Sequence, residues 1–175
     1  MKQIALTDDH VLLRRGLANL VENLGYNVMF EVDNGQELMD KVLAGSLPDL
    51  VLMDINMPEK DGYETTQWLK DNYPGINVLA LTMYDDERAI IRMLKCGAKG
   101  YVVKDVEPAE LRTAMEAVLN KGFYYSEMVT GRLVRTITDM DDDQSDTKKL
   151  LNLSDREIEF LKLACSELTY KEVAG

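Results

Sequence analysis

The sequence predicts a doubly wound α/β fold with a five-stranded parallel sheet, followed by an incomplete all-α segment. Five short apolar runs alternate along the chain with five stretches in which apolar residues recur at helical spacing. The runs are apolar throughout and do not alternate with polar residues, which is typical of parallel strands that helices cover on both faces. In such a fold, ligands bind where the strands end at their carboxyl edge.

The predicted elements follow one another in strict strand and helix order. Apolar runs predict strands at 4–6, 28–30, 50–53, 78–81 and 101–103. Apolar residues at helical spacing predict helices over 11–24, 38–43, 62–73, 85–96 and 107–121. Gly25 ends the first helical pattern, and Gly45 and Pro48 close the second. Residues 1–122 therefore form one predicted domain.

The composition of the chain changes after Gly122, and the predicted organisation changes with it. Residues 123–152 predict a linker, with a short helix near 126–137 and an acidic run at 139–146. Residues 153–175 return to a helical apolar pattern and form a separate predicted segment.

Charge and composition limit the classes of protein that fit. The chain has 175 residues, enough for one well-cored domain and a fragment of another. Its 20 Lys and Arg against 31 Asp and Glu give a net charge of −11, which disfavours non-specific binding to nucleic acid. Two distant cysteines and a single histidine support neither a disulfide framework nor a Cys/His zinc site. No apolar run approaches the roughly 20 residues of a membrane span, and the start lacks a signal-peptide pattern, so we expect a cytoplasmic protein without membrane contact.

Polar side chains follow four of the predicted strands. Asp8 and Asp9 follow the first strand, Asp54 the third, Thr82 the fourth and Lys104 the fifth. Three carboxylates at one edge would repel one another unless a cation lies between them, and oxygen ligands suit Mg²⁺. A Mg²⁺ ion bound by Asp9, Asp54 and a backbone carbonyl could also hold oxygens of a phosphoryl group. Asp54 would then be the nucleophile, with Lys104 neutralising phosphoryl oxygens and Thr82 donating its hydroxyl.

Each of these residues also has a simpler interpretation. The acidic pair could cap the following helix, and Asp54 could be an exposed loop acid. Thr82 could be a packed β-branched residue and Lys104 a solvated charge. Their joint placement at strand ends favours a phosphoryl-transfer site over these separate explanations. His10 is expected to be a surface or capping residue, because a lone histidine is weak support for catalysis.

This combination of residues resembles the receiver domains of response regulators. The resemblance covers about residues 1–122 and depends on Asp8-Asp9, the segment 54–62, Thr82 and the segment 101–104. It implies a flavodoxin-like fold and a signalling protein, not an enzyme, whose Asp54 accepts a phosphoryl group from a sensor histidine kinase. It also implies that Asp9, Asp54 and the backbone carbonyl of Asn56 hold Mg²⁺, with Asp8 assisting nearby.

The resemblance further implies a conformational switch. Thr82 would move toward the phosphoryl group, and the aromatic ring of Tyr101 would turn inward to fill the space that Thr82 leaves. Pro58 and Gly62 would lie in a mobile loop after the acceptor, where a constrained turn and a conformationally permissive residue are needed.

The C-terminal segment resembles the beginning of a LuxR-type helix-turn-helix domain. Ser154 precedes Glu157 by three residues, a capping-box pattern that predicts a helix start, and Thr169 would cap a second helix. The whole chain then resembles the NarL/FixJ family of two-component response regulators, which implies transcriptional regulation and homodimers formed on phosphorylation. Because the sequence stops before a recognition helix, we expect specific DNA binding in the complete form alone.

Three alternatives remain open at this stage. Residues 153–175 could be an amphipathic helical hairpin for partner contact, and residues 150–175 are expected to be poorly ordered, packed on the receiver or paired with another chain. The chain could act as a receiver-only interaction module through dimerisation. It could also be a haloacid-dehalogenase-like phosphatase, although Asn56 occupies the position where that class has a second aspartate.

Overall fold

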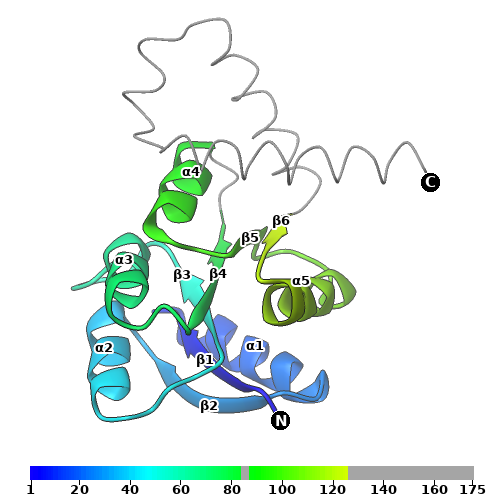
Figure 1. Cartoon of the computed structure of the whole chain (residues 1–175). Helices are drawn as coiled ribbons and strands as arrows, with labels where there is room; N and C mark the ends of the chain where they lie inside the picture. Colours follow the sequence, from blue (N-terminus) through cyan, green and yellow to red (C-terminus); the bar gives the residue numbers. More distant parts are fainter. Residues whose placement is uncertain (84–86, 126–175) are drawn as a thin grey trace, which may run out of the picture.

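A computed structural model describes residues 1–83 and 87–125 of the chain. Strands and helices alternate in the predicted order (Figure 1). The strands are β1 (Gln3–Thr7), β2 (Asn27–Val32), β3 (Leu50–Asp54), β4 (Asn77–Thr82), β5 (Gly100–Val103) and β6 (Tyr124–Tyr125). The helices are α1 (Val11–Asn23), α2 (Gly35–Leu43), α3 (Gly62–Asn72), α4 (Glu87–Cys96) and α5 (Pro108–Lys121). The doubly wound α/β fold is therefore confirmed.

All pairings within the sheet are parallel. The strand order is β2-β1-β3-β4-β5-β6, so the chain moves from β1 outward to β2 and then returns past β1 to β3. This reversal between β1 and β3 creates a topological switch point, where the loops after the two strands diverge to opposite faces. A ligand-binding crevice is therefore expected beside the carboxyl ends of β1 and β3.

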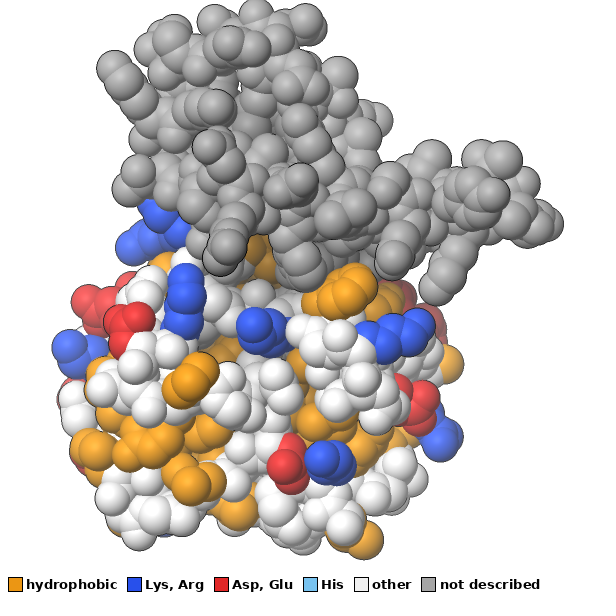
Figure 2. All heavy atoms as spheres, in the orientation of Figure 1, with side chains coloured by type: hydrophobic (Ala, Val, Ile, Leu, Met, Phe, Trp, Pro, Cys, Tyr) orange, Lys and Arg blue, Asp and Glu red, His pale blue; other side chains and the backbone are white. Residues whose placement is uncertain are grey.

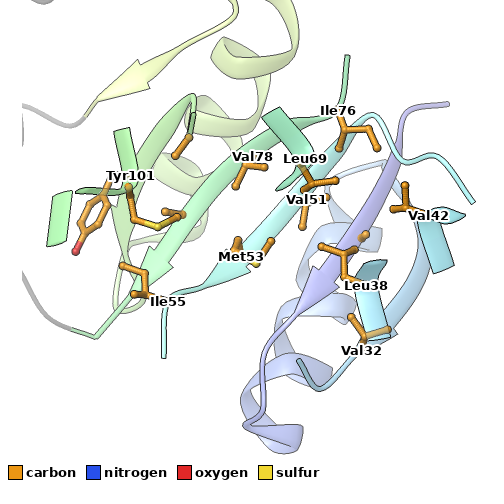
Figure 3. Packing of buried hydrophobic residues seen from close by; sticks show 14 of the residues in the cluster. Val32, Leu38, Val42, Val51, Met53, Ile55, Leu69, Ile76, Val78 and Tyr101 are labelled. Carbon is orange, nitrogen blue, oxygen red and sulfur yellow. The ribbon is translucent and has the colours of Figure 1, made fainter. Parts of the chain in front are cut away.

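The unbroken apolar runs supply two cores, one on each face of the sheet. On β3, Val51 and Met53 join the cluster beneath α2, α3 and α4, and Leu50 and Leu52 join the cluster beneath α1 and α5. Successive side chains of a strand point to opposite faces, so a strand covered on both sides must be apolar at every position. Figure 3 shows the first of these clusters, with Tyr101 at one end of it.

Local sequence signals explain several element boundaries. Asn34 caps α2 by accepting a hydrogen bond from the Glu37 amide, and Asp61 caps α3 by accepting one from the Glu64 amide. After α5, Gly122 has a φ of 90°, in the left-handed region that glycine adopts without strain. The sixth strand is the one addition to the predicted sheet within the described residues. Its two residues are too few to produce a recognisable periodicity.

Several predictions concern parts of the chain outside the described residues. These are the helix near 126–137, the acidic run at 139–146, the helix-turn-helix segment at 153–175, and the arrangement of 150–175. Among residues 1–83 and 87–125, no helix has the length and apolar character that a membrane span requires. On the face shown in Figure 2, basic and acidic side chains of the described part are interspersed and form no continuous basic patch.

Candidate functional site

The carboxyl edge of the sheet brings together the polar residues that the sequence singled out. Strands β1, β3, β4 and β5 are successive neighbours, so their carboxyl ends share one edge. Asp54 is the last residue of β3 and Thr82 the last of β4, whereas Asp8 and Lys104 directly follow β1 and β5. The Lys104 amide donates a hydrogen bond of 2.7 Å to the Thr82 carbonyl, which joins the ends of β4 and β5.

The ammonium group of Lys104 lies between two of the carboxylates. Its Nζ is 2.7 Å from Oδ2 of Asp8 and 3.2 Å from Oδ1 of Asp54. The side chains of Lys104, Asp8 and Asp54 are 3%, 5% and 7% exposed, so water screens these ion pairs little. The interpretations of Lys104 as a solvated charge and of Asp54 as an exposed loop acid are therefore wrong.

The two carboxylates respond differently to this burial. Burial and the nearby charge of Asp8 raise the pKa of Asp54 to about 6, although Lys104 and the Ile55 amide oppose the shift. Burial also opposes ionisation of Asp8, but hydrogen bonds from Lys104 and from the His10 amide outweigh it and lower the pKa of Asp8 below its ordinary value. The ionised form of Asp8 is thus stabilised in the folded chain. For Asp54, the contacts with Lys104 and the Ile55 amide do not fully offset the cost of burying the charge.

One oxygen of Asp54 has no hydrogen-bond partner. Its Oδ1 accepts from the Ile55 amide at 2.9 Å and contacts Lys104, whereas Oδ2 is buried without a partner among the described residues. Buried polar atoms are normally paired, and a buried charge without a partner is costly. This oxygen is therefore available to a cation or to an incoming electrophile.

The acidic pair does not cap the following helix. His10 occupies the N-cap position of α1, and its side chain makes no capping hydrogen bond. Asp8 instead accepts from the amide of His10, and the Nδ1 atom of His10 lies 3.2 Å from one carboxylate oxygen of Asp8 and of Asp9. The capping interpretation of Asp8 and Asp9 is therefore wrong, while the surface position expected for His10 is confirmed, because its side chain is 64% exposed.

The cluster has the composition that a hard divalent cation requires. Asp8, Asp9, His10 and Asp54 each place one ligand atom within 4.8 Å of the others. Carboxylate oxygens are the ligands that Mg²⁺ prefers, and Mg²⁺ retains several water molecules when it binds. The Asp9 side chain is 33% exposed, so the cluster reaches solvent on that side. With the unpartnered oxygen of Asp54, these residues fit a Mg²⁺ ion.

The sequence also singles out Thr82, Tyr101 and Asn56. Thr82 is 3% exposed and Tyr101 is fully buried. Asn56, two residues after the acceptor position, lies in the exposed loop that follows β3.

Gly62, the first residue of α3, packs against the backbone of Asp54. A Cβ atom at this position would lie 2.4 Å from the Asp54 carbonyl oxygen and 2.8 Å from the Ile55 Cα. The Gly62 amide also donates a 2.8 Å hydrogen bond to the Ile55 carbonyl. The expectation that this glycine supplies a permissive conformation is wrong, because the loop residue with positive φ is Glu59. Glycine is needed at position 62 for space.

Arg14 of α1 belongs to the site, and the sequence reasoning missed it. Its Nη1 donates to the carbonyl oxygens of Asp8 and Val32, at 2.7 and 3.2 Å, and also to the Asp33 carboxylate. Its Nε lies 3.4 Å from Glu31, and the side chain is 11% exposed. Arg14 therefore holds together the carboxyl ends of β1 and β2. Glu31 and Asp33, which follow the second apolar run, are the sequence feature that could have indicated a basic partner there.

Comparisons with known proteins identify the class to which this fold and site belong. Residues 4–116 match the family described as the response regulator receiver domain. This match covers more than half of the chain, which therefore belongs to the response-regulator receiver family.

The similar proteins are transcriptional and oxygen regulators. The chain is 35% identical over 98% of its length to the transcriptional regulatory protein DegU of Brevibacillus brevis, and it spans 65% of that protein. It is 32% identical over 98% of its length to the oxygen regulatory protein NreC of Staphylococcus haemolyticus, of which it spans 81%. A LuxR-family two-component response regulator from Aurantimonas superposes with a TM-score of 0.71 and 30% identity, over 77% of this chain and 96% of that one.

Proposed function

We propose that this chain is a phosphorylation-controlled response regulator whose Asp54 accepts a phosphoryl group. The observation that carries the proposal is the buried Oδ2 atom of Asp54, which has no partner and belongs to a carboxylate cluster beside Lys104. A nucleophilic carboxylate needs an oxygen that is free to attack, together with positive charge where the phosphoryl oxygens will lie.

The proposed reaction transfers a phosphoryl group from a phosphohistidine of a sensor kinase. An oxygen of Asp54 attacks phosphorus in line, a new O–P bond forms, and the N–P bond to the donor imidazole breaks. The imidazole leaves with the electron pair of that bond and takes up a proton. Lys104 is placed to neutralise an equatorial phosphoryl oxygen, and Thr82 is proposed to donate its hydroxyl to another.

Asp8, Asp9, Asp54 and the backbone carbonyl of Asn56 are the residues proposed to hold Mg²⁺. When bound, Mg²⁺ would offset the charge of the carboxylates and of the phosphoryl oxygens. Asp8 contributes to this site as a carboxylate that Lys104 and the His10 amide keep ionised. Asp54 contributes its unpartnered oxygen. Thr82 and Tyr101 are proposed to form the conformational switch.

Intact-mass measurement after incubation with a small phosphodonor tests the acceptor directly. The wild-type chain should gain the mass of one phosphoryl group in the presence of Mg²⁺, and chelation by EDTA should prevent the gain. The Asp54→Asn variant should gain none, whereas the matched variant Asp40→Asn, which changes an exposed acid on α2, should behave as wild type. Equal phosphorylation of Asp54→Asn and wild type would overturn the assignment.

We further propose that the complete protein regulates transcription in the cytoplasm and forms homodimers on phosphorylation. The similar protein DegU is named a transcriptional regulatory protein, and this chain spans 65% of its length, so the role is proposed for the whole protein. The proposed division is 1–122, 123–152 and 153–175, although strand β6 at the start of the second segment pairs with β5 of the receiver sheet. Light scattering with and without a phosphodonor tests dimerisation: an unchanged mass at full phosphorylation would contradict it.

The other function considered from the sequence has less support. A haloacid-dehalogenase-like phosphatase would require turnover of phosphomonoesters, and membership of the receiver family argues against that class. The receiver-only interaction module would accept the same phosphoryl group on Asp54. It differs from the main proposal in acting through dimerisation and not through DNA binding.

A further inference from the structure

The imidazole of His10 lies inside the carboxylate cluster, although the proposed phosphotransfer uses only the backbone amide of this residue. Its Nδ1 atom is 3.2 Å from Oδ1 of Asp8 and 3.2 Å from Oδ1 of Asp9. The imidazole is 64% exposed and makes no capping hydrogen bond to α1. The imidazole therefore contacts both carboxylates from the solvent side, where little packing restricts its orientation.

A second observation shows that this cluster has an incomplete set of interactions. Oδ2 of Asp54 is buried and unpartnered, and Asp54 belongs to the same group of ligand atoms within 4.8 Å of one another. Lys104 occupies Oδ2 of Asp8 and Oδ1 of Asp54. Lys104 therefore does not contact the other oxygen of either carboxylate, Oδ1 of Asp8 or Oδ2 of Asp54. The same cluster also contains an imidazole nitrogen of His10.

Imidazole changes which metal ions such a cluster favours. Mg²⁺ prefers oxygen ligands, whereas Zn²⁺, Co²⁺, Ni²⁺ and Cu²⁺ bind well to sites that combine imidazole with carboxylates. A ring nitrogen beside two carboxylates therefore strengthens the binding of these transition-metal ions more than it strengthens the binding of Mg²⁺. Both kinds of ion would use the same aspartates, so their binding is mutually exclusive.

We propose that His10 is a nitrogen ligand that makes this pocket a binding site for transition-metal divalent ions, which compete there with Mg²⁺. The inference builds on the proposed function, because it assigns a second ion class to the same pocket. Occupancy by such an ion would withdraw Asp8 and Asp9 from Mg²⁺. His10 would thus set the metal specificity of the site.

Calorimetric titration of the full chain with Co²⁺ and with Mg²⁺ tests the specificity. In the His10→Asn variant, the ratio of Co²⁺ affinity to Mg²⁺ affinity should fall about tenfold or more, since even groups that only orient metal ligands change affinity by roughly 10-fold to 100-fold. Asparagine is a preferred N-cap residue, so this substitution retains the start of α1. Circular dichroism checks that retention. Asp54→Asn should weaken binding of both ions.

Pulsed electron paramagnetic resonance of the Cu²⁺-loaded chain gives a readout that a purely structural role would not change. The remote nitrogen of a coordinated imidazole modulates the echo, and His10 is the single histidine of the chain, so the modulation can come from this residue alone. It should be present in the wild type and absent in His10→Asn.

The two proposals fail in different ways. An unchanged Co²⁺ to Mg²⁺ ratio in His10→Asn, or a wild-type spectrum without imidazole modulation, would overturn the role of His10 and leave the phosphoacceptor proposal intact. Equal loss of both ions in His10→Asn would also overturn it, because His10 would then only support the fold of the pocket. Failure of Mg²⁺ to bind the wild type would instead count against the proposed function.

Discussion

Replacing Asp54 by asparagine should stabilise the metal-free protein. The folded chain buries this carboxylate beside Asp8 and leaves one of its oxygens unpartnered, so its ionisation costs free energy. The asparagine side chain has nearly the same shape and stands in for the neutral, protonated acid. Lys104 keeps its 2.7 Å contact with Asp8 in the variant, and no buried cation is left without a partner.

The expected magnitude follows from the pKa of Asp54. This pKa rises from 3.8 to about 6 on folding, and each unit corresponds to about 1.4 kcal/mol. Because the folded state binds the proton more tightly, the stability of the wild type falls as pH rises through this interval. Above it, Asp54→Asn should raise the free energy of unfolding by about 3 kcal/mol. At pH 5 the same linkage leaves about half of that gain.

Urea denaturation in the presence of EDTA provides the measurement. Trp68 on α3 is the single tryptophan of the chain and stacks at a tilt on Tyr73, with 5.4 Å between ring centroids, so its fluorescence reports unfolding of this domain. Unfolding curves at pH 7.5 and pH 5 should give the two gains stated above. Saturating Mg²⁺ should stabilise the wild type more than the variant, because ligands stabilise the state that binds them.

Asp40→Asn separates the local effect from that of net charge. It removes one negative charge from a chain of net charge −11, but at an exposed position on α2. Relief of general repulsion would therefore appear in both variants. If Asp54→Asn were no more stable than Asp40→Asn at pH 7.5, or if its gain did not change with pH, the assignment of Asp54 as an uncompensated buried carboxylate would be refuted.

Three further substitutions test the surroundings of the pocket. Lys104→Met should lower the free energy of unfolding at pH 7.5 by roughly 3 to 5 kcal/mol, measured with urea, because it leaves the carboxylates of Asp8 and Asp54 buried without their cation. Gly62→Ala should cost about 1 to 3 kcal/mol and slow phosphorylation in the mass assay, because its Cβ would displace the Asp54 carbonyl. Arg14→Met should weaken Mg²⁺ binding in calorimetry, because the Asp8 backbone loses its anchor.

Each of these expectations has a contrary outcome. Asp54→Asn should stabilise the Lys104→Met variant by more than it stabilises the wild type, and equal gains in the two backgrounds would contradict the proposed charge pairing. Gly75→Ala is the control for Gly62→Ala, because a Cβ at position 75 meets nothing within 4 Å. For Arg14→Met, tighter Mg²⁺ binding would mean that the guanidinium acts through its repulsive charge and not by positioning the Asp8 backbone.

The sequence could predict the fold and the edge at which the site lies. Unbroken apolar runs such as 50–53 indicate parallel strands, and parallel strands place all their carboxyl ends at one edge. Polar residues close after these runs are therefore candidates for the site without knowledge of any distance. Asp8, Asp54, Thr82 and Lys104 could be grouped in this way.

The contacts that distinguish the members of that group could not be predicted. The bridge from Lys104 to both carboxylates, and the imidazole of His10 beside Asp8, depend on side-chain directions that no periodicity encodes. The role of Gly62 was misjudged for a related reason. A sequence shows that glycine can adopt unusual backbone angles, but the steric need at this position arises from a strand and a helix that meet across the fold.

The resting arrangement of Lys104 couples the proposed Mg²⁺ site to the proposed acceptor. Its ammonium group is shared by Asp8 and Asp54, so a phosphoryl group on Asp54 would draw that charge away from Asp8. Asp8 would then need another cation, and this requirement favours Mg²⁺ at the same pocket. Because the Lys104 amide is bonded to the Thr82 carbonyl, any shift of Lys104 would act on the ends of β4 and β5 together. Tyr101 and Val102 of β5 are buried core residues two or three positions before Lys104, so such a shift would act on a strand that is packed into the core.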